Sequence, residues 1–366
     1  MQTIRFDTIR QTSTEYAVGP GCLSRIDSVL SGKVCVVVAD KVAADLHSIK
    51  IDAFTSRTHL LGTLLLSGGE TAKSFETLQN ILRFFKARDL PKHGVVIALG
   101  GGALCDVAAL ATMLMRRGLE LILIPTTLLA QIDAAIGGKN AINLDFAKNF
   151  VGGFHQPSLV CCDQDFLLTL TRRQTICGIA EAVKVTTISD ASVFQRYFSN
   201  PVTLSHLSSP QEWKEFIWDS MRCKLALLAD DVYEQSEARL LNYGHIVGHL
   251  CEEVSRYGLS HGEAVLIGMI VENEISRGLG IGSEEALDHI NAVIGRYITP
   301  VLSEYLYSWE EILPAFARLQ RARCGLMNYV CVVTPGQATI VPETTLDQVG
   351  MAWTRALSFI GRRACL

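Results

Sequence analysis

The stretch 94–108, GVVIALGGGALCDVA, places a short apolar run, three glycines and a second apolar segment in immediate succession. Its first part predicts a buried β-strand over 94–102, because an apolar run of strand length ends abruptly in glycine. The following segment 102–115, GALCDVAALATMLM, predicts a buried helix, since it is too short to span a membrane and carries Asp106. Glycines at such a junction let the backbone approach a diphosphate at the helix N-terminus. A tight turn that binds nothing explains the glycines as well, and both interpretations stay open.

Three further apolar runs predict strands on either side of this junction, at 33–40, 58–66 and 119–127. Between them, residues 74–90 carry apolar side chains at helical spacing. Alternation of strands and helices predicts a parallel sheet covered by helices on both faces. From about residue 172 onward, long helical patterns dominate. We therefore predict an N-terminal α/β domain over residues 1–171 and a mostly α-helical domain over residues 172–366.

The composition is that of a soluble globular protein. Of 366 residues, 49% are hydrophobic and 19% are charged, with a formal net charge of −4. This charge offers no basic excess to attract nucleic acid or an anionic membrane surface. The eleven cysteines include no CxxC pair, and the N-terminus lacks the pattern of a signal peptide. We expect free buried thiols and a cytoplasmic protein that binds neither nucleic acid nor membranes.

Polar residues in two other glycine-rich stretches are candidates for a binding site. LSGGETAKS (66–74) is a second glycine turn after a predicted strand, with Glu70 and Lys73 nearby. Two glycine turns at strand ends indicate dinucleotide binding more strongly than a single turn does. The stretch 125–153 is apolar and rich in glycine, yet it contains Asp133, Lys139, Lys148 and Asn149. A surface loop explains any one of these residues, but the apolar flanks make a solvated face a poor explanation of the whole set.

Three of the nine histidines fall within LLNYGHIVGHLCEEVSRYGLSHGEAV (240–265). His245 and His249 share one helix face by their spacing of four residues, an arrangement common in metal sites. Spacing alone selects these two as ligands, but the glycine turn before His261 could return that residue to the site. A carboxylate would complete the ligand set, and the candidates are Glu181 and Glu263. Ordinary helix histidines remain the alternative.

Taken together, these segments resemble the sugar phosphate cyclases, and most closely the 3-dehydroquinate synthase branch. The resemblance covers residues 65 to 275, and the matching motifs are GGGALCDVA, RRGLELILIPTTLLAQIDAAIGGKNAIN, KNFVGGFHQP, GIAEAVK and LNYGHIVGH…HGEAV. Several long motifs in the same order make a chance match negligible. The resemblance implies a Rossmann-like, NAD-binding N-terminal domain and a helical domain that binds metal and substrate, the dehydroquinate synthase-like fold.

The resemblance also implies a specific set of cofactor ligands. Zinc or cobalt would be held by Glu181, His245 and His261, whereas His249 would lie near the substrate phosphate. NAD would contact the residues that match the family's dinucleotide site: Asp40, Glu70, Lys73, Gly101, Gly102, Asp106, Thr126, Thr127, Lys139, Lys148, Phe166 and Thr169.

The chemistry of the family forms a carbocycle from a sugar phosphate, which makes the expected enzyme a carbon–oxygen lyase. NAD takes a hydride from a hydroxyl carbon held at the metal, phosphate is eliminated, the hydride returns, and an aldol step closes the ring. The matching substrate and catalytic residues are Asp133, Lys139, Lys184, Lys224, Asn149, Asn242, His249 and Arg117. Arg117 matches a residue that reaches the partner subunit's substrate, which implies a homodimer.

Two departures from the family pattern concern the substrate. The arginine that binds the substrate carboxylate in 3-dehydroquinate synthases is replaced by Ala238, and Arg239 follows one residue later, about 100° away on a helix. A phosphate-binding lysine of the family is absent from LQRAR (319–323), where Arg321 or Arg323 could take its place. By its motifs the chain favours 3-deoxy-D-arabino-heptulosonate 7-phosphate, the shikimate-pathway substrate that leads to aromatic amino acids. The alternatives lack a carboxylate: glucose 6-phosphate, as in 2-deoxy-scyllo-inosose synthases, and sedoheptulose 7-phosphate, as in valiolone-type cyclases.

Two other classes of protein fit parts of the sequence. Metal-dependent polyol and alcohol dehydrogenases share the expected fold, but they do not need the phosphate and elimination residues Lys139, Asn149 and Lys184. A cyclase that has lost turnover and only binds NAD is the second alternative. The presence of all three expected metal ligands argues against it.

Overall fold

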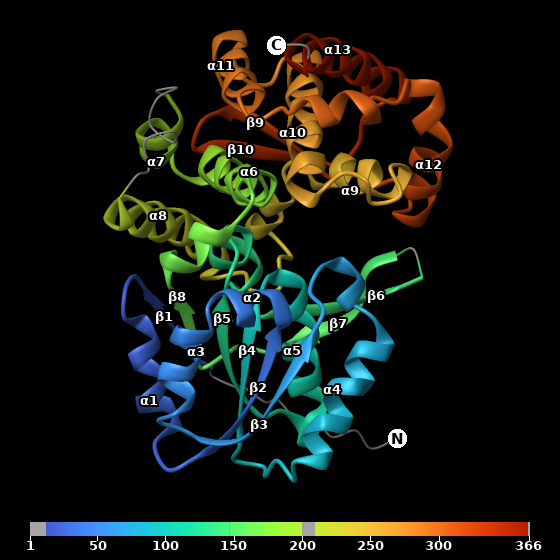
Figure 1. Ribbon diagram of the computed structural model, residues 1–366. Coiled ribbons are helices and arrows are strands. Elements are labelled where there is room, and N and C mark those ends of the chain that lie inside the picture. The colour runs from blue at the N-terminus through green and yellow to red at the C-terminus, as the bar shows by residue number, and fades with distance from the viewer. Residues whose placement is uncertain (1–11, 146, 200–208, 365–366) are drawn as a thin grey trace, which may run out of the picture. The chain divides into compact units, whose positions relative to one another are not determined.

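A computed structural model describes residues 12–145, 147–199 and 209–364 (Figure 1). The chain divides into two compact units, one within Met1–Pro125 and Gly138–Asp163, and the other within Thr126–Gly137 and Gln164–Leu366. The second unit therefore includes a short earlier segment of the chain. The domain ranges 1–171 and 172–366 stay a prediction.

The first unit is built on a six-stranded parallel sheet. Its strands are β1 (Glu15–Val18), β2 (Val34–Asp40), β3 (His59–Leu66), β4 (Val95–Gly100), β5 (Glu120–Pro125) and β8 (Leu159–Cys162). The order is β1-β8-β5-β4-β2-β3, and every pair of neighbours is parallel. Strands β2, β4 and β5 occupy inner positions, and their apolar runs are almost completely buried. The four predicted strands and the parallel sheet are confirmed.

Helices connect the strands of this sheet, because a parallel pair requires a crossover. They are α1 (Arg25–Leu30), α2 (Lys41–Leu46), α3 (Ser48–Thr55), α4 (Phe75–Ala87) and α5 (Gly102–Leu114), with short helical turns η1 (Cys22–Ser24), η2 (Glu70–Ala72) and η3 (Met115–Arg117). The predicted helices at 74–90 and 102–115 are thus α4 and α5. Ser74 caps α4 by accepting a hydrogen bond from the Thr77 N–H. An antiparallel ribbon of β6 (Lys139–Leu144) and β7 (Ala147–Phe154) completes the unit.

The second unit is mostly helical. Its helices are α6 (Arg172–Ser189), α7 (Ala191–Phe194), α8 (Pro210–Leu228), α9 (His245–Val254), α10 (His261–Gly278), α11 (Glu284–Gly295), α12 (Trp309–Ala322) and α13 (Leu346–Ala364). Shorter turns are η4 (Ala130–Ala134), η5 (Gln164–Thr169), η6 (Gln195–Ser199), η8 (Glu237–Asn242) and η9 (Pro300–Tyr305), and β9 (Tyr329–Thr334) pairs with β10 (Gln337–Val341). Figure 1 shows α10 surrounded by other elements of this unit, and residues 262–276 are all buried.

Glycines allow α9 and α10 to pack closely. A Cβ atom on Gly268 of α10 would lie 1.9 Å from the carbonyl oxygen of Gly244, which precedes α9. A Cβ on Gly248 would lie 3.1 Å from the carbonyl oxygen of Ala264. Both helices begin with a histidine, so the close packing sets the distance between His245 and His261.

Two expectations from composition can be compared with this fold. In residues 12–145, 147–199 and 209–364, no helix combines the length and the hydropathy required to traverse a bilayer. Every cysteine in the same ranges is a free thiol, and all of them except Cys324 are buried. The prediction of free buried thiols is confirmed for the described residues.

Candidate active site

Three predicted ligands from three helices converge in the second unit. Glu181 lies in the middle of α6, His245 is the first residue of α9, and His261 is the first residue of α10. The Nε2 atoms of His261 and His245 lie 3.3 and 3.6 Å from Oε1 of Glu181. One potential ligand atom from each residue lies within 4.8 Å of the others. The structure thus brings together the three residues that the family resemblance selected.

The environment of Glu181 fits a cation ligand. Its carboxylate is 1% exposed, and within the described residues neither oxygen accepts a well-formed hydrogen bond, although Lys184 Nζ lies 2.5 Å from Oε2. Ligand bonds of about 2.1 Å at a tetrahedral centre place ligand atoms about 3.4 Å apart, close to the separations found here. One carboxylate and two imidazoles are a common ligand set of catalytic zinc. The donor set therefore fits a divalent zinc or cobalt ion.

The second ring nitrogen of His245 is also engaged. Its Nδ1 lies 3.1 Å from the backbone carbonyl oxygen of Tyr243. A carbonyl oxygen can only accept, so the proton resides on Nδ1 and the Nε2 lone pair faces Glu181. This tautomer is the one that a metal ligand requires.

The two histidines differ in protonation in the absence of a cation. Burial, reinforced by the Lys184 ammonium, lowers the pKa of His245 well below its usual value. Burial also opposes the protonation of His261, but the carboxylates of Glu181 and Glu252 beside its ring nitrogens raise its pKa to about 10. For Glu181, burial is outweighed by Lys184 and the two imidazoles, which hold its pKa well below the usual range. A negative carboxylate at the centre of the cluster follows from these contacts.

Two lysines and an aspartate extend this cluster. Lys224 Nζ of α8 donates to both the carbonyl oxygen and Oδ1 of Asp133, each at 2.7 Å. Lys184 Nζ lies 3.9 Å from the same Oδ1. Burial opposes ionisation of Asp133, but the two ammonium groups lower its pKa. For Lys184, the nearby carboxylates outweigh burial and raise its pKa, so that Lys184 and Asp133 are both charged at neutral pH.

Glu263, the other carboxylate that the sequence suggested as a ligand, has a different set of partners. Its Oε2 accepts hydrogen bonds from the Ser260 N–H at 2.8 Å and the Ser260 hydroxyl at 2.6 Å. The bond from the N–H is the side-chain half of the capping box of α10. Arg173 of α6 binds the same carboxylate through two nitrogens. The Glu263 carboxylate therefore binds Ser260 and Arg173 and stabilises the start of α10.

The substituted carboxylate-binding position lies in η8. Ala238 is fully buried, and its N–H donates to Oδ2 of Asp231 at 3.1 Å. Backbone N–H groups of this turn, the largest contribution coming from Gln235, lower the pKa of Asp231 to about 2. Arg239 donates from Nε to the Glu234 carbonyl oxygen at 3.3 Å, and Asn242 donates to the Arg239 carbonyl oxygen at 3.1 Å. The Arg239 side chain therefore binds the backbone of its own loop.

The predicted dinucleotide residues of the first unit follow the carboxyl ends of adjacent strands. Asp40 ends β2 and caps α2 by accepting from the Ala43 N–H at 3.0 Å. Glu70 and Lys73 follow β3, whereas Gly101 and Gly102 link β4 to α5. A Cβ on Gly68 would overlap the Asp40 carboxylate, so a larger residue there would displace that side chain. Carboxyl ends of parallel strands are the usual nucleotide site of such sheets.

A buried lysine organises the polar residues at this edge. Lys73 is 5% exposed, and its Nζ lies 2.5 Å from Oδ2 of Asp106 and also donates to Oδ1 of Asn149. Lys148 Nζ lies 4.0 Å from Oε1 of Glu70. These five predicted site residues form two contact groups, which Asn143 joins into one.

Asn143 of β6 is a residue of this group that the sequence analysis did not single out. Its N–H donates to the Lys73 carbonyl oxygen at 2.9 Å, and its Nδ2 donates to Oε1 of Glu70 at 2.8 Å. Its Oδ1 accepts from the Asn149 N–H at 2.9 Å, beside a left-handed backbone with φ of 52° at Asn149. Its place at the end of the GGKNAIN motif was the only sequence signal.

The remaining predicted residues are distributed over both units. Lys139 begins β6 and Arg117 ends η3, and both side chains are exposed. Thr126, Thr127, Phe166 and Thr169 belong to the second unit. Thr127 accepts a hydrogen bond from the Ala130 N–H at 3.2 Å, and the Phe166 side chain is fully buried. His249 follows His245 by one turn of α9, with ring centroids 5.3 Å apart.

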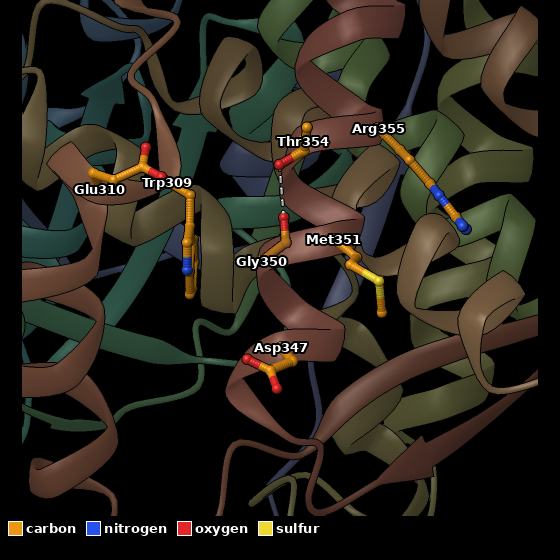
Figure 2. Close-up of a pocket in the computed structure, with 7 residues that line it drawn as sticks. All are labelled: Trp309, Glu310, Asp347, Gly350, Met351, Thr354 and Arg355. Atoms are coloured by element: carbon orange, nitrogen blue, oxygen red, sulfur yellow. Dashed lines mark hydrogen bonds between the residues drawn. The ribbon is translucent and has the colours of Figure 1, made fainter.

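A cavity of 530 Å³ lies elsewhere in the second unit, between α12 and α13 (Figure 2). Its lining residues are Trp309, Glu310, Asp347, Gly350, Met351, Thr354 and Arg355. None of these is a predicted site residue. The candidate site is therefore defined by the cluster of α6, α9 and α10 rather than by this cavity.

Comparison with known proteins places these features in a family. Residues 63–177 match the family model described as 3-dehydroquinate synthase N-terminal, and residues 178–321 match 3-dehydroquinate synthase C-terminal. The chain is 35% identical to 2-epi-valiolone synthase of Actinosynnema mirum, over 89% of this chain and 86% of that protein. It is 34% identical to 3-dehydroquinate synthase of Haemophilus ducreyi, over 91% and 93% of the two chains.

A solved structure agrees with the same assignment. The structure of ValA, a 2-epi-5-epi-valiolone synthase from Streptomyces hygroscopicus subsp. jinggangensis 5008 with NAD+ and Zn2+ bound, matches with a TM-score of 0.88 and 27% identity. The match covers 97% of this chain and 99% of that chain. The resemblance inferred from motifs is therefore confirmed: the chain belongs to the 3-dehydroquinate synthase-like sugar phosphate cyclases and is an enzyme of that superfamily.

Proposed function

We propose that this enzyme converts a sugar phosphate to a carbocycle with elimination of phosphate, using NAD and a divalent zinc or cobalt ion. The observation that carries the proposal is the convergence of Glu181, His245 and His261 beside the charged group of Lys184, Asp133 and Lys224. When bound, the cation would act as a Lewis acid on the substrate oxygens, and NAD would accept and return a hydride.

The residues around the proposed cation site have distinct tasks. Glu181, His245 and His261 hold the cation. Lys184 is buried and its raised pKa keeps it positively charged, so it orients Glu181 and offers a positive charge to substrate oxygens. Asp133, held between Lys184 and Lys224, accepts hydrogen bonds from substrate hydroxyls, which Asn242 also contacts. His249, one helical turn after His245, contacts the substrate phosphate. Lys139 and Asn149 of the first unit are further substrate contacts that the family resemblance implies.

NAD binds at the carboxyl edge of the parallel sheet in this proposal. Asp40 and Glu70 accept hydrogen bonds from ribose hydroxyls, and the N–H groups after Gly101 receive the diphosphate at the start of α5. Lys73 and Asp106 hold this edge together, with Lys148 beside Glu70. Thr126, Thr127, Phe166 and Thr169 complete the expected NAD contacts. We also expect a homodimer, in which Arg117 reaches the substrate phosphate of the partner subunit.

The surroundings of Ala238 favour a substrate without a carboxylate. A buried alanine offers no charge to an anion, and Arg239 is engaged with the carbonyl oxygen of Glu234. A bidentate arginine–carboxylate pair is among the strongest hydrogen-bonded contacts, so its loss would weaken binding of a keto-acid substrate. We therefore propose sedoheptulose 7-phosphate first, in line with the similarity to a 2-epi-valiolone synthase. The motifs alone favour 3-deoxy-D-arabino-heptulosonate 7-phosphate, so this proposal changes the order of the candidate substrates.

A second candidate substrate is 3-deoxy-D-arabino-heptulosonate 7-phosphate. It is supported by the motif residues Lys139 and Asn242 and by the 34% identity to a 3-dehydroquinate synthase. Glucose 6-phosphate is the third candidate, since it also lacks a carboxylate.

Phosphate release by the purified enzyme, with NAD and zinc or cobalt, tests the proposal on the three substrates side by side. Release from sedoheptulose 7-phosphate without accumulation of NADH is the expected result. Release only from the keto-acid phosphate would refute the substrate assignment and keep the cyclase. Steady NADH formation from polyols, with no phosphate release from any of the three, would instead indicate a dehydrogenase. Glu181→Gln is the matched inactive control.

A further inference from the structure

Glu252 lies against the ring nitrogen of His261 that does not face Glu181. Its Oε1 is 3.3 Å from Nδ1 of His261, whereas Nε2 of the same ring is 3.3 Å from Oε1 of Glu181. Glu252 is on α9, seven residues after His245, and two helical turns place the two side chains on one face. Helix α9 therefore provides the proposed ligand His245 and, through Glu252, also contacts the proposed ligand His261.

Burial makes this contact energetically important. Glu252 is 1% exposed, and an ionised carboxylate removed from water must be compensated by hydrogen-bond donors or positive charge. A carboxylate only accepts hydrogen bonds, so the facing Nδ1 of His261 carries the proton. Nε2, which lies beside Glu181, is then the ring nitrogen that remains to bind a cation. The carbonyl oxygen of Tyr243 imposes the same tautomer on His245.

We propose that Glu252 is a positioning residue that fixes the ring orientation and the tautomer of His261 for cation binding. The inference rests on the proposed function, because it assumes that His261 is a ligand. Partners on the outer ring nitrogen of a histidine ligand orient the ring and make the ligand more basic, and their loss commonly weakens metal binding 10- to 100-fold.

The side chains around His261 also suggest a second cation site, and the proposal excludes it. His249, Glu252 and His261 also offer three ligand atoms within 4.8 Å, as a second cation site would require. His261 belongs to both groups, so two cations would share one imidazole ring. A proton on Nδ1 leaves only Nε2 available to a cation. The proposal therefore predicts one cation per chain.

Metal affinity and spectroscopy of Glu252 variants test this inference without relying on turnover. The expected result for Glu252→Ala is zinc binding weakened about 10- to 100-fold in competition with a chromophoric chelator. The visible absorption bands of the cobalt-loaded protein should also change, because the geometry at His261 is no longer held. Glu252→Gln should lie between wild type and alanine, since an amide oxygen still accepts from Nδ1. The control is Glu253→Ala, which removes an exposed carboxylate that pairs with Arg318 at 2.8 Å.

The outcomes separate this inference from the proposed function. A wild-type chain that binds no divalent cation would refute both. One cation in the wild type, with equal affinity and an unchanged cobalt spectrum in both Glu252 variants, would refute only the role of Glu252. Two cations bound per wild-type chain would also refute the role of Glu252 and leave the proposed function standing. If Glu252→Ala does not fold, the comparison of Glu252→Gln with wild type decides.

Discussion

Arg173 in the first turn of α6 and Glu263 in the first turn of α10 form a bidentate ion pair. The Nε atom of Arg173 lies 3.0 Å from both carboxylate oxygens, and a terminal nitrogen lies 2.6 Å from Oε2. The same nitrogen donates to the Gly258 carbonyl oxygen at 2.7 Å, in the turn before His261. The pair therefore ties the helix that carries Glu181 to the start of the helix that carries His261.

Replacing this arginine should destabilise the fold. Arg173→Met leaves the carboxylate of Glu263, which is 1% exposed, without its cationic partner. We expect a loss of about 1–3 kcal/mol, because Arg173 is half exposed and Ser260 still donates to the carboxylate. Urea unfolding measures the change. Arg172→Met is the matched control and should be neutral. Equal unfolding midpoints for the two variants would contradict a role for the pair.

Loss of the Asn143 side chain should weaken NAD binding. Asn143→Ala removes the bonds to Glu70 and to the Asn149 N–H, each worth about 1 kcal/mol. We expect roughly tenfold weaker NAD binding, measured by calorimetry, since about 1.4 kcal/mol corresponds to a factor of ten.

Two comparisons make this prediction specific. Asn143→Asp keeps the acceptor for Asn149 but places a negative charge beside Glu70, so it should not restore binding. Leu144→Ala changes the exposed neighbouring residue and should bind NAD as wild type does. Wild-type affinity in Asn143→Ala would show that Glu70 and Asn149 are held by other contacts.

Buried Glu272 of α10 should make stability depend on pH. Burial raises its pKa from 4.5 to about 8, although the Gly244 and Val330 N–H groups partly oppose the shift. Between these two values the unfolded chain has lost a proton that the folded chain retains. Stability should therefore fall as pH rises from about 4.5 to 8, by at most about 1.4 kcal/mol per pH unit for this group.

Glu272→Gln should flatten this part of the stability profile. The free energy of unfolding, measured in urea at several pH values, compares the variant with wild type. Glu310→Gln, at an exposed position of α12, serves as the control for loss of one carboxylate. Parallel profiles for wild type and Glu272→Gln would mean that Glu272 does not retain its proton in the fold.

An added methyl group between α9 and α10 should disrupt both stability and cation binding. Gly268→Ala places a Cβ 1.9 Å from the Gly244 carbonyl oxygen, so the helices must separate. We expect a loss of about 1–3 kcal/mol in thermal unfolding, with weaker zinc binding because His245 begins α9.

The same helix contains a matched control for this substitution. Gly278→Ala at the end of α10 meets no atom within 4 Å. It should be neutral or slightly stabilising, since alanine favours helix more than glycine does. Equal melting temperatures for the two variants would refute the close-packing argument.

Local pattern accounts for the elements that the sequence could predict. Strands β2, β3, β4 and β5 are short apolar runs that end in glycine, aspartate or threonine, and α5 is a continuous apolar segment. Each pattern is contained within a few neighbouring residues, so it can be recognised without knowing what packs against it. The ribbon of β6 and β7 was missed, because neither strand contains an apolar run of strand length and β7 carries two glycines.

The candidate site was only partly accessible from local pattern. Spacing on one helix face selected His245 and His249 as metal ligands. Only the family resemblance replaced His249 with His261 in the expected ligand set. Nothing in the spacing of residues indicates that Glu252 faces His261, that Arg173 binds Glu263, or that Asn143 joins Glu70 to Asn149.

The sequence by itself determined the alternation of strands and helices, the family, and the residue types available for catalysis, because these depend on local pattern and motif order. The tertiary structure decided which ring nitrogens face Glu181, which carboxylates are engaged elsewhere, and how Arg239 is oriented. The first two of these properties depend on the packing of α6, α9 and α10, and the third depends on the loop around η8. Such packing results from contacts between residues far apart in the chain, as where Gly268 meets Gly244.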